Sequence, residues 1–591
     1  ELSGVACEAL ADLTRHVVGG ELSRRLATTR GIHAVLRGYD AVYHESVRRA
    51  GRLTFGDIQR LLLPDGGAGV LTSDAGGEGR LFIDYRLDAE IDHWLLDEFQ
   101  DTSYGQWSVL KNLIDEVVQD TSGRRSFFCV GDVKQAIFAW REGDSRLFGE
   151  IFRYYNTAAP GAVTAEHLDR SWRSGPAIIE MVNAVFGAAP AIGGLFPGAA
   201  SESWNDDWRP HVSAFPQRAG QAALIWAADE DERWKRMLEI LHEIRPIERG
   251  LTCAILVPKN STATALADYL RREGGLPAVA ESDLHVCTDN PMGAALLALM
   301  QAAAYPGDTM AWEHVQMTPL ASVLAEEGIT TREAATWRVL TAVHADGFER
   351  AIEVWLRQLE SRLDGGDGFN RTRARQFAAA AARYDQSGGR SVAEFIQFME
   401  RHVVRDPEGA DVVRVMTIHK SKGLGFDVVI LPDLQGKRID SRREGLAVQK
   451  AADRTVEWIL DLPPKLFYEA DDVLSRHVRA AEAEACHEAL SLLYVALTRA
   501  KRAMYAIVEP PGNSVSRNHP KLLAETLGDS DPGVPVGDLR LSGGWSSGDP
   551  RWHHSVVAAS KPVAPISALG PLSGWEGEPV IHLSLIHISE P

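Results

Sequence analysis

Short, almost wholly apolar runs, separated by stretches of helical spacing, constrain the fold of this 591-residue chain more than any other feature. Four runs precede residue 260 and two follow residue 410, namely 93–96, 127–130, 222–226, 253–257, 412–416 and 428–431. A strand that is apolar on both faces must be covered on both faces, and helices between parallel strands supply that cover. The pattern therefore predicts an α/β protein with buried strands in a parallel sheet.

A helical segment interrupts this α/β pattern. Residues from about 290 to 405 are rich in Ala, Leu, Arg and Glu and contain no convincing strand pattern. The most apolar run, Ala294 to Ala304, is shorter than the ~20 residues of a membrane span, so it indicates a buried helix. Helix and strand patterns resume afterwards and alternate from Tyr494 to Val508. The sequence thus predicts one α/β unit with a helical insertion.

The charge and cysteine content exclude several classes of protein. Lys+Arg 62 against Asp+Glu 81 leave a formal charge of −19, which argues against coating nucleic acid by bulk charge but allows a local basic groove. The five cysteines are scattered and form no C-x-x-C pair. This disfavours a zinc finger, a cysteine-ligated cluster or a disulfide framework. We expect a cytoplasmic protein without a membrane partner.

The two ends of the chain suggest a truncated sequence. The first residue is Glu1 rather than methionine, and helical spacing begins at once. Residues 583–591 do not continue the pattern before them and resemble a translated adapter, so we expect a non-native tail there. The chain after about residue 510 is expected to be loop-like.

Two carboxylates, Asp97 and Glu98, directly follow the apolar run 93–96. Ligands of open α/β sheets bind beyond the carboxyl ends of the strands. An aspartate there can hold Mg²⁺ that bridges nucleotide phosphates, and an adjacent glutamate can orient or deprotonate the attacking water. The alternative is an ordinary surface turn, which Gln100 and Asp101 in the same turn make less favourable.

Polar and aromatic residues follow the run 127–130 in the same way. The amide of Gln135 can sense a γ-phosphate, and Phe138, Trp140 and Arg141 combine two aromatic faces with a cation. Exposed bases of a single strand stack on such faces, at ~1–3 kcal/mol per base. Phe138 could equally be a core aromatic, whereas Trp140 is flanked by polar residues and is expected to be exposed.

These two segments, 94–102 and 127–135, resemble motifs II and III of the UvrD/Rep/RecB group of superfamily 1 helicases. Four other segments resemble further motifs in the family's order. They are 53–58, like the DNA-side motif before motif II; 168–174 with Ile178 and Asn183, like motif IV; 415–426, like motif V; and 493–501, like motif VI. The last two are most similar to the RecB/AddA branch, whose members are subunits of helicase–nuclease complexes.

The resemblance implies two RecA-like parallel-sheet domains, the first truncated and the second carrying the helical insertion. The implied division is a helical accessory part at 1–80, the rest of the first domain at 81–163, and the second domain at 164–289 and 406–510 around an insert at 290–405. Residues 511–582 are expected to be a linker and 583–591 the tail.

The resemblance also implies roles for single residues. Asp97 would bind Mg²⁺, Glu98 would serve the catalytic water, and the γ-phosphate would contact Gln135, Arg173 and Arg499. Of the motif V residues, Lys422 and Gly423 would lie near the nucleotide and Thr417 and His419 near the DNA backbone. Arginine suits this task because its guanidinium matches phosphate oxygens and keeps its charge. Outside the family, Arg499 could pair with a surface carboxylate, Arg173 could cap a strand, and Lys422 could lie in a solvated turn.

The implied function is an ATP- and Mg²⁺-dependent DNA helicase or translocase that moves on single-stranded DNA in double-strand break repair or recombination. Its partners would be single-stranded or duplex DNA and another protein of a nuclease complex. One alternative is a stand-alone UvrD/Rep-like repair helicase without a nuclease. Another is a DNA-binding or scaffolding protein that has lost ATPase activity.

Several positions depart from the family pattern. The phosphate loop Gly-x-x-x-x-Gly-Lys-[Ser/Thr], which cradles nucleotide phosphates, is absent from this sequence, so we expect little ATPase from the chain alone. The family places that loop upstream of motif II. Gly425 stands where the family usually has Glu, Ser171 where it has Asn, and Ser491 where it commonly has Arg. No nuclease signature is recognisable after residue 510.

Overall fold

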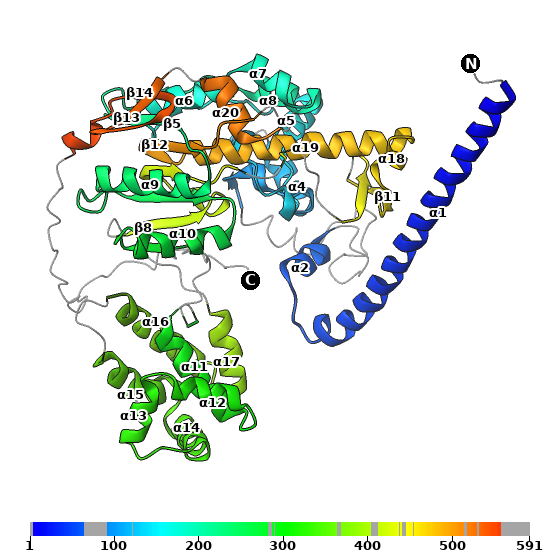
Figure 1. Ribbon diagram of the computed structural model, residues 1–591. Helices are drawn as coiled ribbons and strands as arrows, with labels where there is room; N and C mark the ends of the chain where they lie inside the picture. Colours follow the sequence, from blue (N-terminus) through cyan, green and yellow to red (C-terminus); the bar gives the residue numbers. More distant parts are fainter. Residues whose placement is uncertain are drawn as a thin grey trace.

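The computed structural model describes residues 4–63, 91–120, 122–281, 287–288, 290–362, 368–402, 412–435, 438–439, 445–452, 454–512, 517–528 and 531–556. These residues form a mixed α/β fold with one large sheet, a small parallel sheet and a separate helical body (Figure 1). The predicted α/β class with a helical insertion is confirmed.

The large sheet has the strand order β13-β14-β5-β12-β9-β6-β8-β7. Its parallel strands are β5 (Gln221–Trp226), β6 (Cys253–Val257), β7 (Ala278–Ala280), β8 (Val413–Thr417), β9 (Phe426–Leu431) and β12 (Ala500–Val508). Alternate residues of β5 enter two different cores, with Leu224 on one face and Ala223 and Ile225 on the other. Four of the predicted apolar runs are therefore strands of this sheet, almost wholly buried because both faces are covered.

Helices cover the two faces of the large sheet unequally. One face carries α6 (Pro176–Phe186), α7 (Ala189–Leu195), α8 (Gly198–Asp207), α19 (Asp472–Leu497) and α20 (His519–Leu527), and the other carries α9 (Glu230–Ile244) and α10 (Asn260–Arg272) (Figure 1). The start of α9 is encoded locally. Asp229 accepts a hydrogen bond from the Glu232 amide, and three acidic residues in the first turn favour the positive end of the helix dipole.

The small sheet pairs β1 (His93–Leu96) with β2 (Ser126–Cys129) in parallel, and α4 (Tyr104–Gln119) and α5 (Arg146–Ala158) pack on one of its faces. Trp94, Leu96 and Phe127 face these helices, whereas Leu95 is 72% and Phe128 59% exposed. The prediction that both runs are fully buried strands is therefore wrong, because only one face of the described sheet is covered. We call this unit, with its turns up to residue 163, the small-sheet body.

The insertion is an independent helical body with its own core. Its helices are α11 (Pro291–Ala304), α12 (Thr309–Gln316), α13 (Leu320–Glu326), α14 (Arg332–Asp346), α15 (Phe348–Glu360), α16 (Gly368–Asp385) and α17 (Val392–Arg401). Helix α11 packs against most of the others, as its apolar run predicts. Phe348 and Phe395 stack in this core with ring centroids 4.0 Å apart.

The N-terminal segment is helical over its described length. Helix α1 (Gly4–Tyr43) continues into the π-helical turn η1 (His44–Arg48), and α2 (Phe55–Leu62) contacts α4. Helix α1 extends away from the large sheet (Figure 1) and meets the antiparallel hairpin of β10 (Ala447–Lys450) and β11 (Val456–Leu460). There Arg25 pairs with Asp461 at 2.9 Å. The last part of the predicted accessory segment, 64–80, lies outside the described residues.

The prediction that residues 511–582 form a linker is wrong for the described residues of that range. Helix α20 belongs to the core, and β13 (Asp531–Val536) and β14 (Leu539–Gly548) extend the large sheet, with β14 antiparallel to β5. These strands carry Gly, Pro and Ser, so they show no apolar run, although Val534 and Val536 alternate into the core. The Gly537-Asp538 turn between the two strands was the sequence feature that could have indicated this hairpin. Residues 557–582 and the expected tail at 583–591 lie outside the described residues.

Within the described residues, no single helix is long and apolar enough to cross a membrane. Among the described helices, α6 and α7 taken together have the length and apolar composition of a membrane span, but they are bent by 48° at the break between them. Both helices contribute buried residues to the core of the large sheet.

Candidate functional site: the junction between the two sheets

The acidic turn after β1 has a constrained backbone. Glu98 adopts the left-handed region (φ 50°, ψ 38°), which is uncommon for a residue with a side chain. Asp97 Oδ1 accepts a hydrogen bond from the Glu98 amide at 2.8 Å, and Glu98 Oε2 accepts one from Gln100 Nε2 at 2.6 Å. The same Gln100 accepts from the Asp132 amide at 3.0 Å, which links the two strand ends. Both carboxylates are exposed and held in place by this network.

Gln135 follows β2 in a 3₁₀ turn and contacts the large-sheet side of the molecule. Its Nε2 donates to Asp132 Oδ2 at 3.0 Å, and its Oε1 accepts from Arg499 Nη2 at 3.2 Å. Arg499 lies between α19 and β12, 364 positions away in the sequence. The fold therefore brings these two predicted γ-phosphate residues into direct contact.

Arg499 is 1% exposed and donates to neutral oxygens. These are the carbonyls of Val495 and Leu424, at 2.9 and 3.3 Å, the Thr498 hydroxyl at 3.1 Å, and the Gln135 amide. Burial, and then the neighbouring Arg173 charge, lowers the pKa of Arg499 to about 9. Pairing with a surface carboxylate, the alternative interpretation of Arg499, is wrong for the described part of the chain.

Arg173 follows the short strand β3 (Arg170–Ser171) and donates to the Thr498 carbonyl at 3.4 Å. Burial lowers the pKa of Arg173, against the opposing charge of Glu98. A Cβ atom at Gly425 would lie 3.0 Å from Arg173 Nε. The glycine at this departure from the family pattern therefore leaves room for the guanidinium, and a side chain there would displace it.

Lys422 crosses from the large sheet to the acidic turn. Its buried ammonium group bonds the Asp101 carboxylate and the Gln135 carbonyl, the latter at 2.8 Å, and lies 3.8 Å from Glu98 Oε2. Burial raises the pKa of Asp101, although Lys422 opposes that shift. The alternative of a solvated turn is wrong for Lys422. The neighbouring Gly423 has a positive φ of 82°, which lets the chain turn beside it.

The aromatic segment after Gln135 divides between surface and core. Trp140 is 52% exposed, as predicted, and the Arg141 guanidinium lies 4.6 Å from its ring centroid. Phe138 is half-buried against the core of the large sheet, with its centroid 6.2 Å from that of Trp140 and 6.4 Å from that of His419. Phe138 thus packs across the junction, and Trp140 with Arg141 presents an open face.

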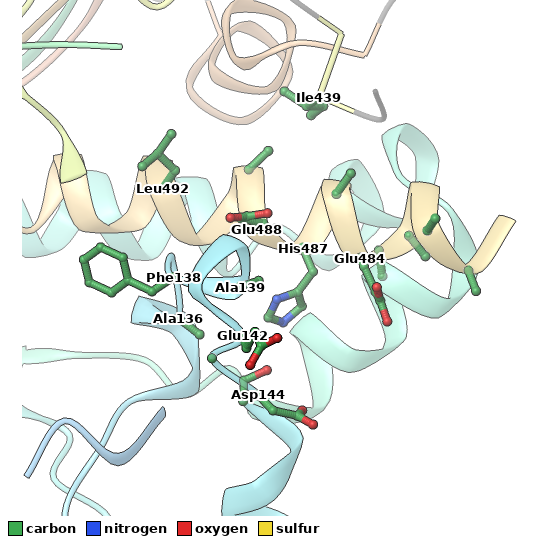
Figure 2. A pocket seen from close by; sticks show the side chains of 18 of the residues that line it. Ala136, Phe138, Ala139, Glu142, Asp144, Ile439, Glu484, His487, Glu488 and Leu492 are labelled. Atoms are coloured by element: carbon green, nitrogen blue, oxygen red, sulfur yellow. The ribbon is translucent and has the colours of Figure 1, made fainter. Parts of the chain in front are cut away.

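A cavity of about 1380 Å³ lies beside this segment, between the small-sheet body and α19. Figure 2 shows Phe138, Glu142 and Asp144 on one side and Glu484, His487 and Glu488 of α19 on the other. His419 also lines the cavity, and burial lowers its pKa. Thr417 is not among the lining residues; it is buried, and its hydroxyl accepts from the Lys420 amide at 3.4 Å.

Comparison with known protein families shows which family the two sides of this junction resemble. Residues 35–155 match the UvrD/REP helicase N-terminal domain, and residues 337–509 match the UvrD-like helicase C-terminal domain. The chain contains the N- and C-terminal domains of UvrD-like helicases. The matched ranges contain the segments similar to motifs II, III, V and VI, so the resemblance seen in the sequence is confirmed.

The relatives of this UvrD-like chain are larger proteins. It is 24% identical over 497 residues to an ATP-dependent helicase/nuclease subunit of Anoxybacillus flavithermus, covering 70% of this chain and 39% of the relative. The protein of the same name from Geobacillus thermodenitrificans is 24% identical over 570 residues, at 80% and 44% coverage. The exonuclease/helicase subunit RexA of Lactococcus lactis is 24% identical over 500 residues, at 70% and 40%. The chain spans about two fifths of the length of these relatives.

One residue of the junction was missed in the sequence. Arg454, in the turn of the β10–β11 hairpin, donates to Asp144 Oδ2 at 2.6 Å and lies 3.0 Å from a Glu150 carboxylate oxygen. Its guanidinium also lies 5.2 Å from the Tyr104 ring centroid. Asp144 is 310 positions from Arg454, so no local pattern could have indicated the pair.

We expect Arg454→Ala to destabilise the junction by roughly 1–3 kcal/mol, because Asp144 keeps only Arg146 as a charged partner among the described residues and Glu150 loses its contact with Arg454. Urea unfolding followed by tryptophan fluorescence measures the loss. The control is Arg551→Ala, which removes an exposed pair with Asp538 and is expected to change stability by less than about 1 kcal/mol. Equal effects of the two substitutions would contradict the proposed role of Arg454.

Proposed function

We propose that this UvrD-like chain is the motor part of an ATP-dependent DNA helicase that moves on single-stranded DNA in double-strand break repair or recombination. The observation that carries the proposal is the convergence of Gln135, Arg499 and Lys422 beside the strand-end acids. Residues from the two sheets meet there, as they must if a bound nucleotide is to control how the two bodies move.

The charge of the junction suits a polyanionic ligand. The neighbouring Arg173 charge helps to lower the pKa of Arg499, and neither arginine forms an ion pair within the described part of the chain. The fork-shaped guanidinium groups match phosphate oxygens, so a γ-phosphate would supply the missing counter-charge. The amides and lysine of a phosphate loop, which this sequence does not contain, would have to complete the nucleotide site.

We assign the following roles to the residues of the junction. Asp97 would hold Mg²⁺, and Glu98, fixed by Gln100, would orient and deprotonate the attacking water. Gln135 would contact the γ-phosphate, and its hydrogen bond with Arg499 would couple that contact to the position of Arg499. When bound, ATP with Mg²⁺ supplies the phosphoryl group whose hydrolysis drives the motor. Lys422 and Gly423, which belong to the motif V segment, would lie near the nucleotide.

The DNA side of the proposal rests on Trp140, Phe138 and Arg141. Thr417 is turned inward, so we expect His419 rather than Thr417 to approach DNA in this arrangement. The cavity beside this face is lined both by carboxylates, such as Glu484 and Glu488, and by basic side chains, such as Lys259, so its charge does not favour a phosphate backbone (Figure 2). We therefore propose that the strand runs over the Trp140 face with its bases, rather than its phosphates, toward the protein.

The relatives suggest the setting of this motor. Two of them are named as parts of a helicase/nuclease and one as part of an exonuclease/helicase. We propose that this protein acts on broken DNA together with a second protein.

We expect Trp140→Ala to weaken single-strand binding by roughly 1–3 kcal/mol, or about 5- to 150-fold, since one base loses its stacking surface. The chain itself can be tested by fluorescence anisotropy with a labelled oligothymidine at fixed salt concentration. Trp337→Ala is the matched control, because Trp337 is an exposed tryptophan in the helical insertion. Unchanged affinity in Trp140→Ala would remove Trp140 from the DNA path.

The proposed function as a whole is tested with the complete gene product. We expect ATP hydrolysis to rise when single-stranded DNA is added, and a partial duplex to be unwound in the presence of ATP. DNA binding without stimulated hydrolysis would contradict the motor and favour a DNA-binding or scaffolding protein instead.

A further inference from the structure

The last described turn, η6 (Trp552–Ser555), is firmly anchored beside the C-terminal half of α9, far from the junction. Trp552 is fully buried, and its Nε1 donates to the Tyr505 hydroxyl at 3.2 Å. Tyr505 in turn donates to Gln221 Oε1 at 3.0 Å. Arg249 holds the backbone of the turn by donating to the His553 carbonyl at 2.9 Å. The side chains of this turn are therefore presented from a fixed backbone.

Three side chains with metal-ligating atoms converge at this turn. Glu243 of α9, His553 and His554 each place one such atom within 4.8 Å of the other two. His553 is fully buried, yet neither of its ring nitrogens has a hydrogen-bond partner among the described residues, and its Nε2 lies 3.8 Å from Glu243 Oε1. A buried imidazole without hydrogen-bond partners is unfavourable, so a ligand on its ring nitrogens would stabilise the fold.

The carboxylate of Glu243 is oriented independently of the histidines. Its Oε1 accepts a hydrogen bond from the Asp538 amide at 2.9 Å. The preceding Gly537 has a positive φ of 58°, and a Cβ atom there would lie only 1.9 Å from Glu243 Oε1. The β13–β14 turn is therefore shaped to admit this carboxylate. A backbone contact that orients a ligating carboxylate is a usual feature of metal sites.

We propose that Glu243, His553 and His554 bind one divalent transition-metal ion of the zinc class. Two imidazoles with one carboxylate are a ligand set that zinc uses, and the softer ligands of copper or iron–sulfur sites are not part of it. Bonds of about 2.0–2.1 Å in a tetrahedral site put ligand atoms roughly 3.4 Å apart, so the three groups must draw together. His554 is exposed and can turn inward, and a water molecule can take the fourth position.

Binding would join three parts of the fold at one point. Glu243 belongs to α9, its carboxylate bonds the turn of the β13–β14 hairpin, and both histidines follow β14. The ion would therefore fasten the edge hairpin of the large sheet to the helix that covers it. This role is separate from nucleotide and DNA binding, and it makes the unfolding temperature depend on the metal.

The test uses the full chain after chelator treatment and dialysis, with zinc chloride as the probe in isothermal titration calorimetry. Cys7 is exposed and is replaced by serine in every protein so that its thiol does not compete for zinc. We expect one equivalent to bind and the unfolding temperature to rise. His554→Ala and Glu243→Gln should each weaken binding by about 100-fold or more, because each removes one of three ligands.

The control is His344→Ala, which removes an exposed histidine of the helical insertion and should bind zinc like the parent. His554 is at the surface and Glu243→Gln is isosteric, so both variants should fold, which circular dichroism checks. Cobalt(II) should give the visible bands of a tetrahedral site in the parent only. The proposal is overturned if the parent shows no saturable one-equivalent binding, or if both ligand variants bind zinc like the parent.

Discussion

Arg499→Lys is expected to lower DNA-stimulated ATP hydrolysis by the complete gene product by about 10³- to 10⁵-fold. Lysine keeps the positive charge but has one nitrogen where the guanidinium has three. Arg499 divides its donors among Val495, Leu424, Thr498 and Gln135, and it must still present donors to a phosphate. A single ammonium group cannot do both, so the phosphate contact or the contact with Gln135 is lost.

The measurement is steady-state ATP hydrolysis at saturating single-stranded DNA, together with nucleotide binding and the unfolding temperature. Arg502→Lys is the matched control, because Arg502 lies on the same strand but near Asp427, at 3.5 Å, and away from the junction. It is expected to hydrolyse ATP within about twofold of the parent. Hydrolysis by Arg499→Lys at the parent rate, in a folded protein, would show that Arg499 is a structural residue only.

Glu98→Gln is expected to reduce the same hydrolysis by about 10²- to 10⁴-fold while ATP still binds. Glutamine has the same shape, and its amide oxygen can still accept the hydrogen bond from Gln100. It cannot take a proton from water, so only the chemical step should fail. The test compares single-turnover hydrolysis with the binding of a fluorescent ATP analogue.

Asp92→Asn supplies the control for Glu98→Gln, because Asp92 precedes the other end of β1 and pairs with Arg125 at 3.3 Å. It should leave hydrolysis unchanged. If Glu98→Gln binds ATP and turns it over normally, the strand-end acid is not the base. If it binds no ATP, Glu98 acts on the nucleotide rather than on the water.

Much of the fold could be predicted from apolar runs alone. The strands at 222–226, 253–257 and 428–431 are buried on both faces, and burial on both faces is what produces a continuous apolar run. The strands β13 and β14 at the sheet edge were missed because they contain Gly, Pro and Ser instead of an apolar run. Their pairing is set by the hairpin turn between them. Apolar runs also predicted burial on both faces for β1 and β2. This was wrong, because one face of their described sheet is exposed.

The candidate site could be predicted only in part. The strand-end acids and the exposure of Trp140 follow from local sequence, since both depend on neighbouring residues. That Gln135, Arg173, Arg499 and Lys422 belong together came from the family resemblance, because topology rather than spacing brings them into contact. No sequence motif marks Arg454 or the Glu243–His553 pair. Arg454 lies hundreds of positions from Asp144 in the sequence, and Glu243 lies as far from His553. Such contacts become visible only in three dimensions.

Two groups of polar contacts fasten the small-sheet body to the rest of the fold, and this limits its motion. One group joins it to the large sheet, through Lys422 on Asp101 and Gln135 and through Arg499 on Gln135, and the other joins it to the β10–β11 hairpin, through Arg454 on Asp144 and Glu150. A body held at two separate groups of contacts turns most easily about the line through them. Any larger rearrangement must first break one group, and the order in which the two groups break would set the direction of each stroke.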